Sequence, residues 1–158
     1  MIRGKLISVG CSCLALTACG GGSSPPPTQV VRGAGFSFEV PAGWDAKRSE
    51  RGASAADGTR LVSVTRFTLR VTYRPELWTK LVSELDRVAR EVAAREGGAL
   101  SASRTVVVAG RRARQYDVQA GESLAQYTFV LKGKTEYQLL CRDAGEVCAP
   151  FVASFRLG

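Results

Sequence analysis

The sequence predicts an α+β domain built on an antiparallel sheet. Three observations indicate this fold: segments with apolar residues at every second position, short turns that join such segments into hairpins, and one long amphipathic helix. The chain has 158 residues, of which 45% are hydrophobic and 23% charged, as in ordinary globular domains. This composition argues against a wholly disordered chain, and the apolar runs are too short for a polytopic membrane protein.

The first strand is predicted over residues 35–40, where apolar and polar residues alternate. The sequence Pro-Ala-Gly-Trp over 41–44 predicts a turn that places Trp44 against the core. Residues 45–59 are polar and small, so we expect a surface loop there.

A second strand region is predicted over 61–73. Its alternation would put four apolar residues on one face: Phe67, Leu69, Val71 and Tyr73. Val62 and Val64 fall outside this alternation, which predicts a bulge or a turn near residues 65–66.

The long helix is predicted over 75–96, with Pro75 at its first position and two glycines after its end. One apolar stripe is expected to contain Leu77, Trp78, Leu81, Leu85, Val88 and Val92. Ion pairs four residues apart are expected at Glu76–Lys80, Asp86–Arg90 and Glu91–Arg95. A helix lying on a membrane surface is the alternative, but the mixed charges of the polar face count against it.

Two hairpins and a short helix are predicted after the long helix. The first hairpin would join strands over 103–108 and 113–118, and the second would join strands over 124–131 and 135–141. The short C-terminal helix is expected over 147–155.

The amino terminus is typical of a signal peptide. Arg3 and Lys5 precede an uncharged stretch over 6–18, which is too short to cross a hydrocarbon core of about 30 Å. The following Leu-Thr-Ala-Cys resembles the lipobox of bacterial lipoproteins, in which Cys19 receives the diacylglyceryl group and becomes the first residue after cleavage. An ordinary secretory signal, with Cys19 as a spare thiol, is the alternative.

The lipobox divides the chain into a signal peptide over 1–18, the lipidated Cys19 with a Gly/Ser/Pro linker over 19–30, and an α+β domain over 31–158. Several buried acyl chains, such as palmitate, would anchor the mature protein to a membrane of the cell envelope. Because no Asp follows Cys19, we expect the outer membrane, facing the periplasm, if the cell is Gram-negative.

Of the five cysteines, Cys11 and Cys13 would be removed with the signal peptide and Cys19 would be lipidated. The two that remain, Cys141 and Cys148, predict a structural disulfide in an oxidising compartment. A metal or redox site is the alternative, but two thiolates without histidine are a poor zinc site. Loss of Arg3 and Lys5 lowers the net charge from +8 to +6, so the mature chain stays basic. Arg111 and Arg112 lie at a predicted turn, where they could contact a partner or simply be solvated.

Three sequence segments, in this order along the chain, resemble those of a known family. They are Phe-Ser-Phe-Glu-Val-Pro-Ala-Gly-Trp over 36–44, Val-Val-Ala-Gly-Arg-Arg-Ala over 107–113, and Ala-Ser-Phe-Arg over 153–156. They are similar to the PsbP-like superfamily, especially the DcrB-like and LpqN-like bacterial lipoproteins. The resemblance implies an α/β/α sandwich with a curved antiparallel sheet, one long helix and a short C-terminal helix. It also implies binding or assembly roles more often than catalysis.

The chain has no histidine, which excludes Ser-His-Asp and Cys-His catalysis and histidine-ligated metals. We therefore expect a non-catalytic envelope lipoprotein that binds another protein or assists assembly, without a cofactor and without nucleic acid as a partner. A carrier of a small apolar ligand or lipid is the first alternative, and an enzyme of unknown class is the second. Trp44 and Trp78 could line a groove, but core packing is the preferred interpretation for both.

Overall fold

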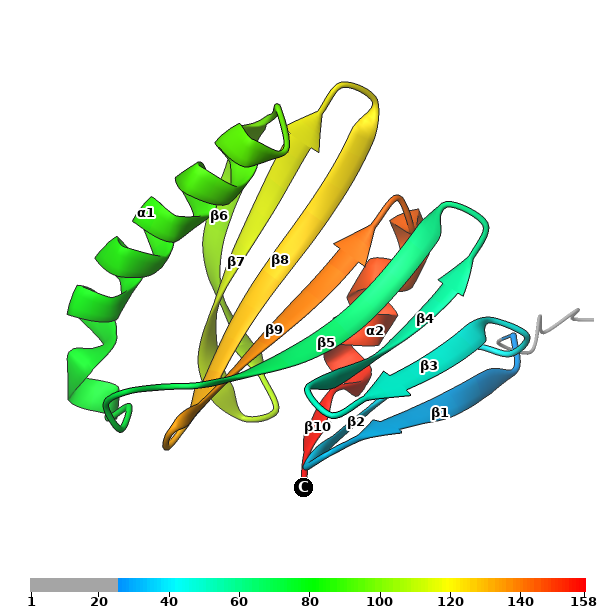
Figure 1. Cartoon of the computed structure of the whole chain (residues 1–158), viewed down its shortest axis with the longest axis horizontal. Helices are drawn as coiled ribbons and strands as arrows, with labels where there is room; N and C mark the ends of the chain where they lie inside the picture. Colours follow the sequence, from blue (N-terminus) through cyan, green and yellow to red (C-terminus); the bar gives the residue numbers. More distant parts are fainter. Residues whose placement is uncertain (1–25) are drawn as a thin grey trace, which may run out of the picture.

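The computed structural model describes residues 26–158, which fold into ten strands and two α-helices (Figure 1). The strands are β1 (Thr28–Gly33), β2 (Phe36–Pro41), β3 (Asp45–Ser49), β4 (Gly52–Asp57), β5 (Arg60–Thr68), β6 (Ala99–Val108), β7 (Arg111–Ala120), β8 (Ser123–Lys132), β9 (Thr135–Arg142) and β10 (Arg156–Leu157). The helices are α1 (Trp78–Arg95) and α2 (Cys148–Ser154), and each follows a 3-10 turn, at Pro75–Leu77 and Gly145–Val147.

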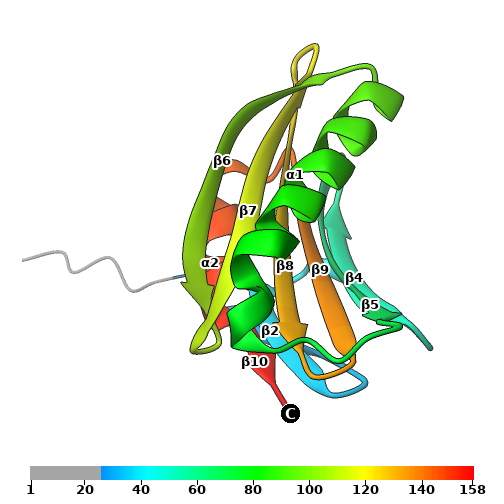
Figure 2. The same ribbon diagram turned by 90° about the vertical axis from the view of Figure 1, so that its left-hand side faces the viewer.

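The strands form two antiparallel sheets. The large sheet has the order β3-β4-β5-β9-β8-β7-β6, and the small sheet has the order β1-β2-β10. Helix α1 lies across one face of the large sheet, and α2 packs with the small sheet on the other face (Figure 2). The result is the predicted α+β sandwich, with a curved sheet between helical layers.

The large sheet is buried on both faces because its central strands alternate between two cores. On β8, Tyr127 and Phe129 pack with Leu85 of α1 in one core. The neighbouring Val130 belongs to the second core, where Phe38 of β2 meets the residues of α2. This two-sided burial fixes the register of β8, since a slip by one residue would exchange its two faces.

The long helix is confirmed, and Trp78 and Leu85 of the predicted stripe are buried, but the buried face also includes two alanines that the stripe left out. Ala89 and Ala93 are buried beside Leu85, whereas Leu77 remains 41% exposed. Alanines have small side chains, so they let the helix approach the sheet closely. Because alanine is less apolar than leucine or valine, a buried alanine is not recognised as part of an apolar stripe in the sequence.

The three predicted ion pairs of the helix are replaced by others. Arg87 pairs with both Glu84 and Glu91, at 2.8 and 2.6 Å. Asp86 reaches from the helix to Arg114 of β7, at 3.1 Å, because its side chain points to the sheet. The predicted pattern assumed that these charges all face solvent, and Asp86 does not.

The surface loop predicted over 45–59 is wrong, because this segment forms β3 and β4. Ala53 and Ala55 of β4 are buried in the core, and β4 pairs with β5 along its full length. Small side chains are needed here: a Cβ on Gly52 would lie 2.2 Å from the backbone oxygen of Val64. The strand is therefore buried without the large apolar residues that signal one in a sequence.

The predicted face of the 61–73 segment is also wrong. Val62 and Val64 are the buried residues of β5, and the ladder between β5 and β9 runs from Leu61 to Thr68 without a bulge. The chain leaves the sheet after Thr68, and the residues that follow form a loop on the β8–β9 turn. Hydrogen bonds from the Leu69 and Tyr73 amides to the Lys134 and Gly133 carbonyls, each 2.8 Å, hold this loop.

The fold begins earlier than the predicted boundary at residue 31. Strand β1 starts at Thr28 and pairs with β2 through its whole length, so the last three residues of the predicted linker are in the sheet. The turn after β2 is confirmed by the hydrogen bond from the Trp44 amide to the Pro41 carbonyl, and Trp44 is buried. The predicted signal peptide and Cys19 lie outside the described residues.

The predicted hairpins and C-terminal helix are confirmed. Strands β6 and β7 flank a two-residue turn in which Ala109 and Gly110 both have positive φ, at 49° and 72°. This geometry matches the twist of the strands. Strands β7 and β8 also pair directly, so β6 to β9 form a continuous meander.

Two polar clusters fasten α1 to the sheet. The Tyr116 hydroxyl donates to Asp86 at 2.6 Å, and the Arg114 guanidinium donates to the same carboxylate at 3.1 Å. At the other end of the helix, Tyr127 and Arg142 donate to Glu96. Burial, followed by the hydrogen bond to Glu96, raises the pKa of Tyr127 to about 12.

The Asp86 cluster predicts an acid-sensitive contribution to stability. Partial burial opposes the charged form of Asp86, but bonds from Tyr116 and Arg114 outweigh it, so the pKa lies below 3.8. A lowered pKa in the folded state stabilises the fold above the ordinary carboxyl range, and this stabilisation is lost as the pH falls through the folded-state pKa.

We expect Asp86→Asn to lower the free energy of unfolding by about 1–2 kcal/mol at pH 7. The difference from the wild type should shrink below pH ~4, where wild-type Asp86 becomes protonated. Urea denaturation at a series of pH values measures both effects. The matched control is Asp45→Asn, which breaks an exposed pair with Lys47 and should change stability by less than about 0.5 kcal/mol. Equal losses in the two variants would contradict the prediction.

Candidate functional site

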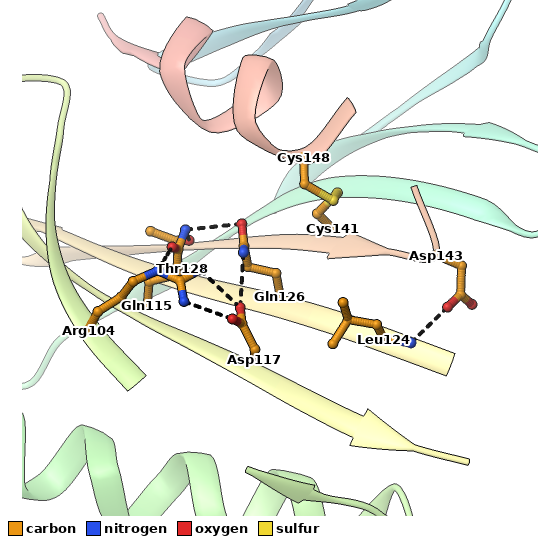
Figure 3. The surroundings of a disulfide bond; sticks show 9 residues. All are labelled: Arg104, Gln115, Asp117, Leu124, Gln126, Thr128, Cys141, Asp143 and Cys148. Carbon is orange, nitrogen blue, oxygen red and sulfur yellow. Dashed lines mark hydrogen bonds and ion pairs between the residues drawn. A yellow bond between two sulfur atoms is a disulfide. The ribbon is translucent and has the colours of Figure 1, made fainter. Parts of the chain in front are cut away.

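The predicted disulfide joins Cys141 of β9 to Cys148 at the start of α2 (Figure 3). The sulfur atoms are 2.01 Å apart and the Cα atoms 5.6 Å apart. Cys141 is buried in the core between the large sheet and α2. The bond therefore fixes the short helix on the sheet, which is the structural role expected from the sequence.

A network of polar side chains crosses β6, β7 and β8 beside the disulfide (Figure 3). The Arg104 guanidinium donates to Gln115 at 2.7 Å and to Asp117 at 2.8 Å. Gln115 in turn donates to Gln126 at 3.1 Å and to the buried hydroxyl of Thr128 at 2.8 Å. Each amide and charge is matched within the network, so this part of the sheet can face a hollow without an unpaired polar group.

The network forms the floor of an open hollow between α2 and the outer strand β6. Its volume is about 390 Å³. Arg104, Gln115 and Gln126 lie at its floor, and Val106 and Val152 contribute apolar surface on β6 and α2. We call this concavity the α2 hollow. The α2 hollow has no signal in the sequence, because Gln115 and Gln126 occupy alternate strand positions that usually face solvent.

The predicted contact residues Arg111 and Arg112 lie beside the β6–β7 turn, and both are exposed. The Arg112 guanidinium stacks over the Trp78 ring, 5.6 Å from its centroid. Among residues 26–158, neither arginine has a carboxylate within 4.0 Å. Both can therefore meet an acidic group from outside.

Both tryptophans are packed in the protein rather than open to a groove. Trp44 is buried, with the Arg60 guanidinium 5.4 Å from its ring centroid. Trp78 is buried at the start of α1 beneath Arg112. The preferred interpretation of each tryptophan as a core residue is confirmed.

A second concavity lies beneath the first turns of α1, where the β5–α1 loop passes. Its volume is about 420 Å³, and its lining is mainly apolar. The apolar lining residues are Leu69, Val71, Tyr73, Leu77, Leu81 and Leu131. Val71 is 71% exposed and Leu77 is 41% exposed. We call this concavity the α1 groove. It forms because the chain leaves the sheet after Thr68 and passes beneath the helix as a loop.

The unpaired charges that line the α1 groove are positive. Arg70 and Lys80 line it, and neither forms an ion pair with another described residue. The lining residue Glu84 is already paired with Arg87. The α1 groove thus combines exposed apolar surface with uncompensated positive charge.

A single carboxyl group stands out from the other acidic residues. Burial raises the pKa of Glu136, whose neighbours in the ladder are Leu131 and Phe67. No hydrogen bond or ion pair joins Glu136 to another described side chain, and within residues 26–158 no three Cys, Asp or Glu residues gather as metal ligands.

Comparisons with known proteins show the fold but give no sequence relative. Sequence-family descriptions and curated protein sequences yield no match. The solution structure of cyanobacterial PsbP (CyanoP) from Synechocystis sp. PCC 6803 is similar, with a TM-score of 0.60 and 14% identity over 90% of this chain and 99% of that one. A crystal structure from Bacteroides thetaiotaomicron has a TM-score of 0.51 and 11% identity, over 84% of this chain and 48% of that one.

The chain therefore has a PsbP-like α+β fold. At these identities the likeness shows the arrangement of sheet and helices, and the function must be argued from this chain's own surfaces. None of the helices formed by residues 26–158 has the length and apolar character needed to cross a membrane.

Proposed function

We propose that the protein is a lipid-anchored lipoprotein of the bacterial cell envelope that binds another protein without catalysing a reaction. Within the PsbP-like fold, we place it with the DcrB-like and LpqN-like lipoproteins. The N-terminal sequence supports the anchor through Cys19, and Gly20 favours the outer membrane in a Gram-negative cell. The observation that carries the binding role is the α1 groove.

Exposed apolar side chains gathered at a concave surface are typical of interaction sites. Val71 and Leu77 are exposed at the α1 groove, whereas Leu69, Tyr73 and Leu81 of the same lining are half-buried. The loop that carries Val71 is fixed by two backbone hydrogen bonds to the β8–β9 turn. A partner would thus meet a surface that is largely pre-formed, which lowers the entropic cost of binding.

The charges of the groove indicate the chemistry of its partner. Arg70 and Lys80 would attract a segment with acidic residues, and the apolar lining would bury Leu, Val or Phe side chains of the same segment. The described chain begins at the opposite end of the molecule from the start of α1 (Figure 1). A tether attached there leaves the groove accessible to a partner, and we infer an acidic, amphipathic segment of an envelope protein.

The α1 groove also supports the second candidate function, a carrier of a small apolar ligand. A volume of about 420 Å³ lies within the range of small-molecule sites. The groove is open, however, and an acyl chain bound there would remain partly in water. Mass spectrometry of an organic extract of the purified protein distinguishes the candidates, because a carrier should retain a stoichiometric lipid other than its covalent anchor.

One experiment in intact cells tests the anchor and the binding role together. The full chain is expressed as wild type, as Cys19→Ala, and with the double change Val71→Asp and Leu77→Asp. After chemical crosslinking, the membrane fraction is isolated and the crosslinked species are identified by mass spectrometry. We expect the wild type to be membrane-bound and crosslinked to a discrete envelope protein, and Cys19→Ala to lose the membrane attachment.

The groove variant should remain on the membrane and lose at least tenfold of the crosslinked species, because two carboxylates would repel an acidic segment and wet the apolar surface. Val30→Asp is the matched control, since Val30 is a similarly exposed valine on β1. Retained crosslinks in the groove variant would overturn the assignment of the groove. Membrane attachment of the Cys19→Ala protein would overturn the anchor.

A further inference from the structure

The two outer strands of the large sheet differ in how they are protected. Edge strands invite pairing with another chain, and charged side chains usually prevent it. Three of the five residues of β3, namely Asp45, Lys47 and Arg48, are charged. The ten residues of β6 include one charge, Arg104, and that guanidinium is engaged by Gln115 and Asp117. Strand β6 is therefore a long edge with little protection.

The ladder with β7 shows which backbone groups of β6 point outward. Val108 and Arg111 flank the two-residue turn and form its closing hydrogen-bonded pair. In an antiparallel ladder such pairs alternate with residues whose N–H and C=O point away from the partner. By this alternation Ser103, Thr105 and Val107 face outward, and no hydrogen bond joins their backbone to another segment of residues 26–158.

A site for side chains lies next to this edge. The α2 hollow is bordered by Val106 of β6 and by Ala149 and Val152 of α2. Because side chains of neighbouring strands line up, alternate residues of a strand added beside β6 would project over this hollow. Val107 is 74% exposed. It would cover part of the added strand on the face of the sheet opposite the α2 hollow.

We propose that β6 receives an extended segment of a partner protein as an additional antiparallel strand of the large sheet. Backbone hydrogen bonds to Thr105 and Val107 would supply affinity, and apolar side chains in the α2 hollow would supply specificity. Arg111 and Arg112 lie at the end of β6, so an acidic residue near the amino terminus of the added segment would meet them. This inference rests on the proposed binding role but uses a different surface from the α1 groove.

The charges of the edge favour a partner of this kind over a second copy of the chain. The charged residues of β6 and of the turn flanks, Arg104, Arg111 and Arg112, are all cationic. Pairing of two β6 strands would bring two such cationic edges together, whereas an acidic segment complements them. A second copy is therefore the competing occupant that the experiment must exclude.

The test uses a fluorescent octapeptide, Asp-Asp-Val-Thr-Val-Thr-Val-Thr, and the purified full chain in detergent. Fluorescence polarisation measures its binding to the wild type and to two edge variants. Thr105→Pro removes an outward N–H without removing a ladder bond to β7, and it should weaken binding at least tenfold. Arg111→Glu should weaken binding several-fold, with a smaller difference at high salt.

Two matched controls make the same changes at the other edge of the sheet. Ala46→Pro places proline at an outward-facing position of β3, and Arg51→Glu reverses an exposed charge at the β3–β4 turn. Both should bind the peptide as the wild type does. Circular dichroism melts confirm that each variant is folded, and Thr105→Val serves as a folded variant that keeps the N–H and should still bind.

Absence of saturable binding to the wild type, or equal binding by Thr105→Pro, would overturn the inference. A sedimentation mass of twice the chain that disappears in Thr105→Pro would assign the edge to a second copy and would also overturn it. These outcomes leave the crosslinking result at the α1 groove unaffected. If the groove variant kept its crosslinks while the peptide bound at β6 as expected, only the assignment of the α1 groove would be overturned.

Discussion

Phe151→Ala should lower the free energy of unfolding by about 3–5 kcal/mol, the largest effect expected of a single side chain here. Phe151 is fully buried, at 0% exposure, and its ring contacts that of Phe38 edge to face with centroids 5.1 Å apart. Because α2 has seven residues, too few for a stable helix in isolation, its attachment to the sheet and β2 depends on this packing. Truncation would leave a cavity between the two sheets.

Guanidinium denaturation followed by circular dichroism measures this loss. Phe67→Ala is the matched control, because Phe67 is 44% exposed and should cost less than about 1 kcal/mol. A loss below about 1 kcal/mol for Phe151→Ala would mean that α2 contributes little to the core.

Removal of the disulfide is expected to have the second largest effect. Replacing Cys141 and Cys148 together by alanine should lower the free energy of unfolding by about 2–3 kcal/mol, because the open chain gains entropy when it unfolds. The closed loop spans a separation of seven residues and includes the 3-10 turn that leads into α2. Detachment of the start of α2 would also remove part of one wall of the α2 hollow.

Unfolding curves of the wild type with and without reductant measure the same contribution. The reduced wild type should approach the stability of the double variant, and the double variant should not respond to reductant. A complementary test is thiol labelling of the unfolded protein. Equal labelling of Cys141 and Cys148 with and without prior reduction would show that the bond is not formed.

The parts of the fold that were predicted correctly are those with large residues or special turns. Phe36, Phe38 and Val40 alternate with polar residues, and they form the buried face of β2. Local backbone chemistry also determines where the long helix starts, at Pro75, and where it stops, at the glycines after it. The same holds for the turn at Ala109-Gly110. Local signals of this kind do not require knowledge of the distant packing partner.

The parts that were missed depend on packing between distant segments. Ala53 and Ala55 are buried because β5 and the small sheet cover them, and alanine by itself favours no face. Val71 and Tyr73 continue an alternation that starts at Phe67, but they lie outside the sheet, in a loop that hydrogen-bonds to the β8–β9 turn. The α1 groove, which arises from this departure, could therefore not be read from periodicity.

The candidate sites divide in the same way. The pairing of Cys141 with Cys148 was predictable, since few cysteines remain after the expected processing. Arg111 and Arg112 were correctly placed at a turn, but their position at the end of an exposed edge became visible only with the strand order. Gln115 and Gln126 gave no signal, because a polar residue at an alternate strand position usually faces water.

The sequence by itself determined the class of fold, the long helix, the hairpins and the cysteine pair, because alternation, capping and turn residues act over a few neighbouring positions. Tertiary structure alone decided which faces of the sheet are covered, where the α1 groove opens, and which edge strand lacks protection. Each of these depends on contacts between segments far apart in the chain, whose free energy no local pattern records.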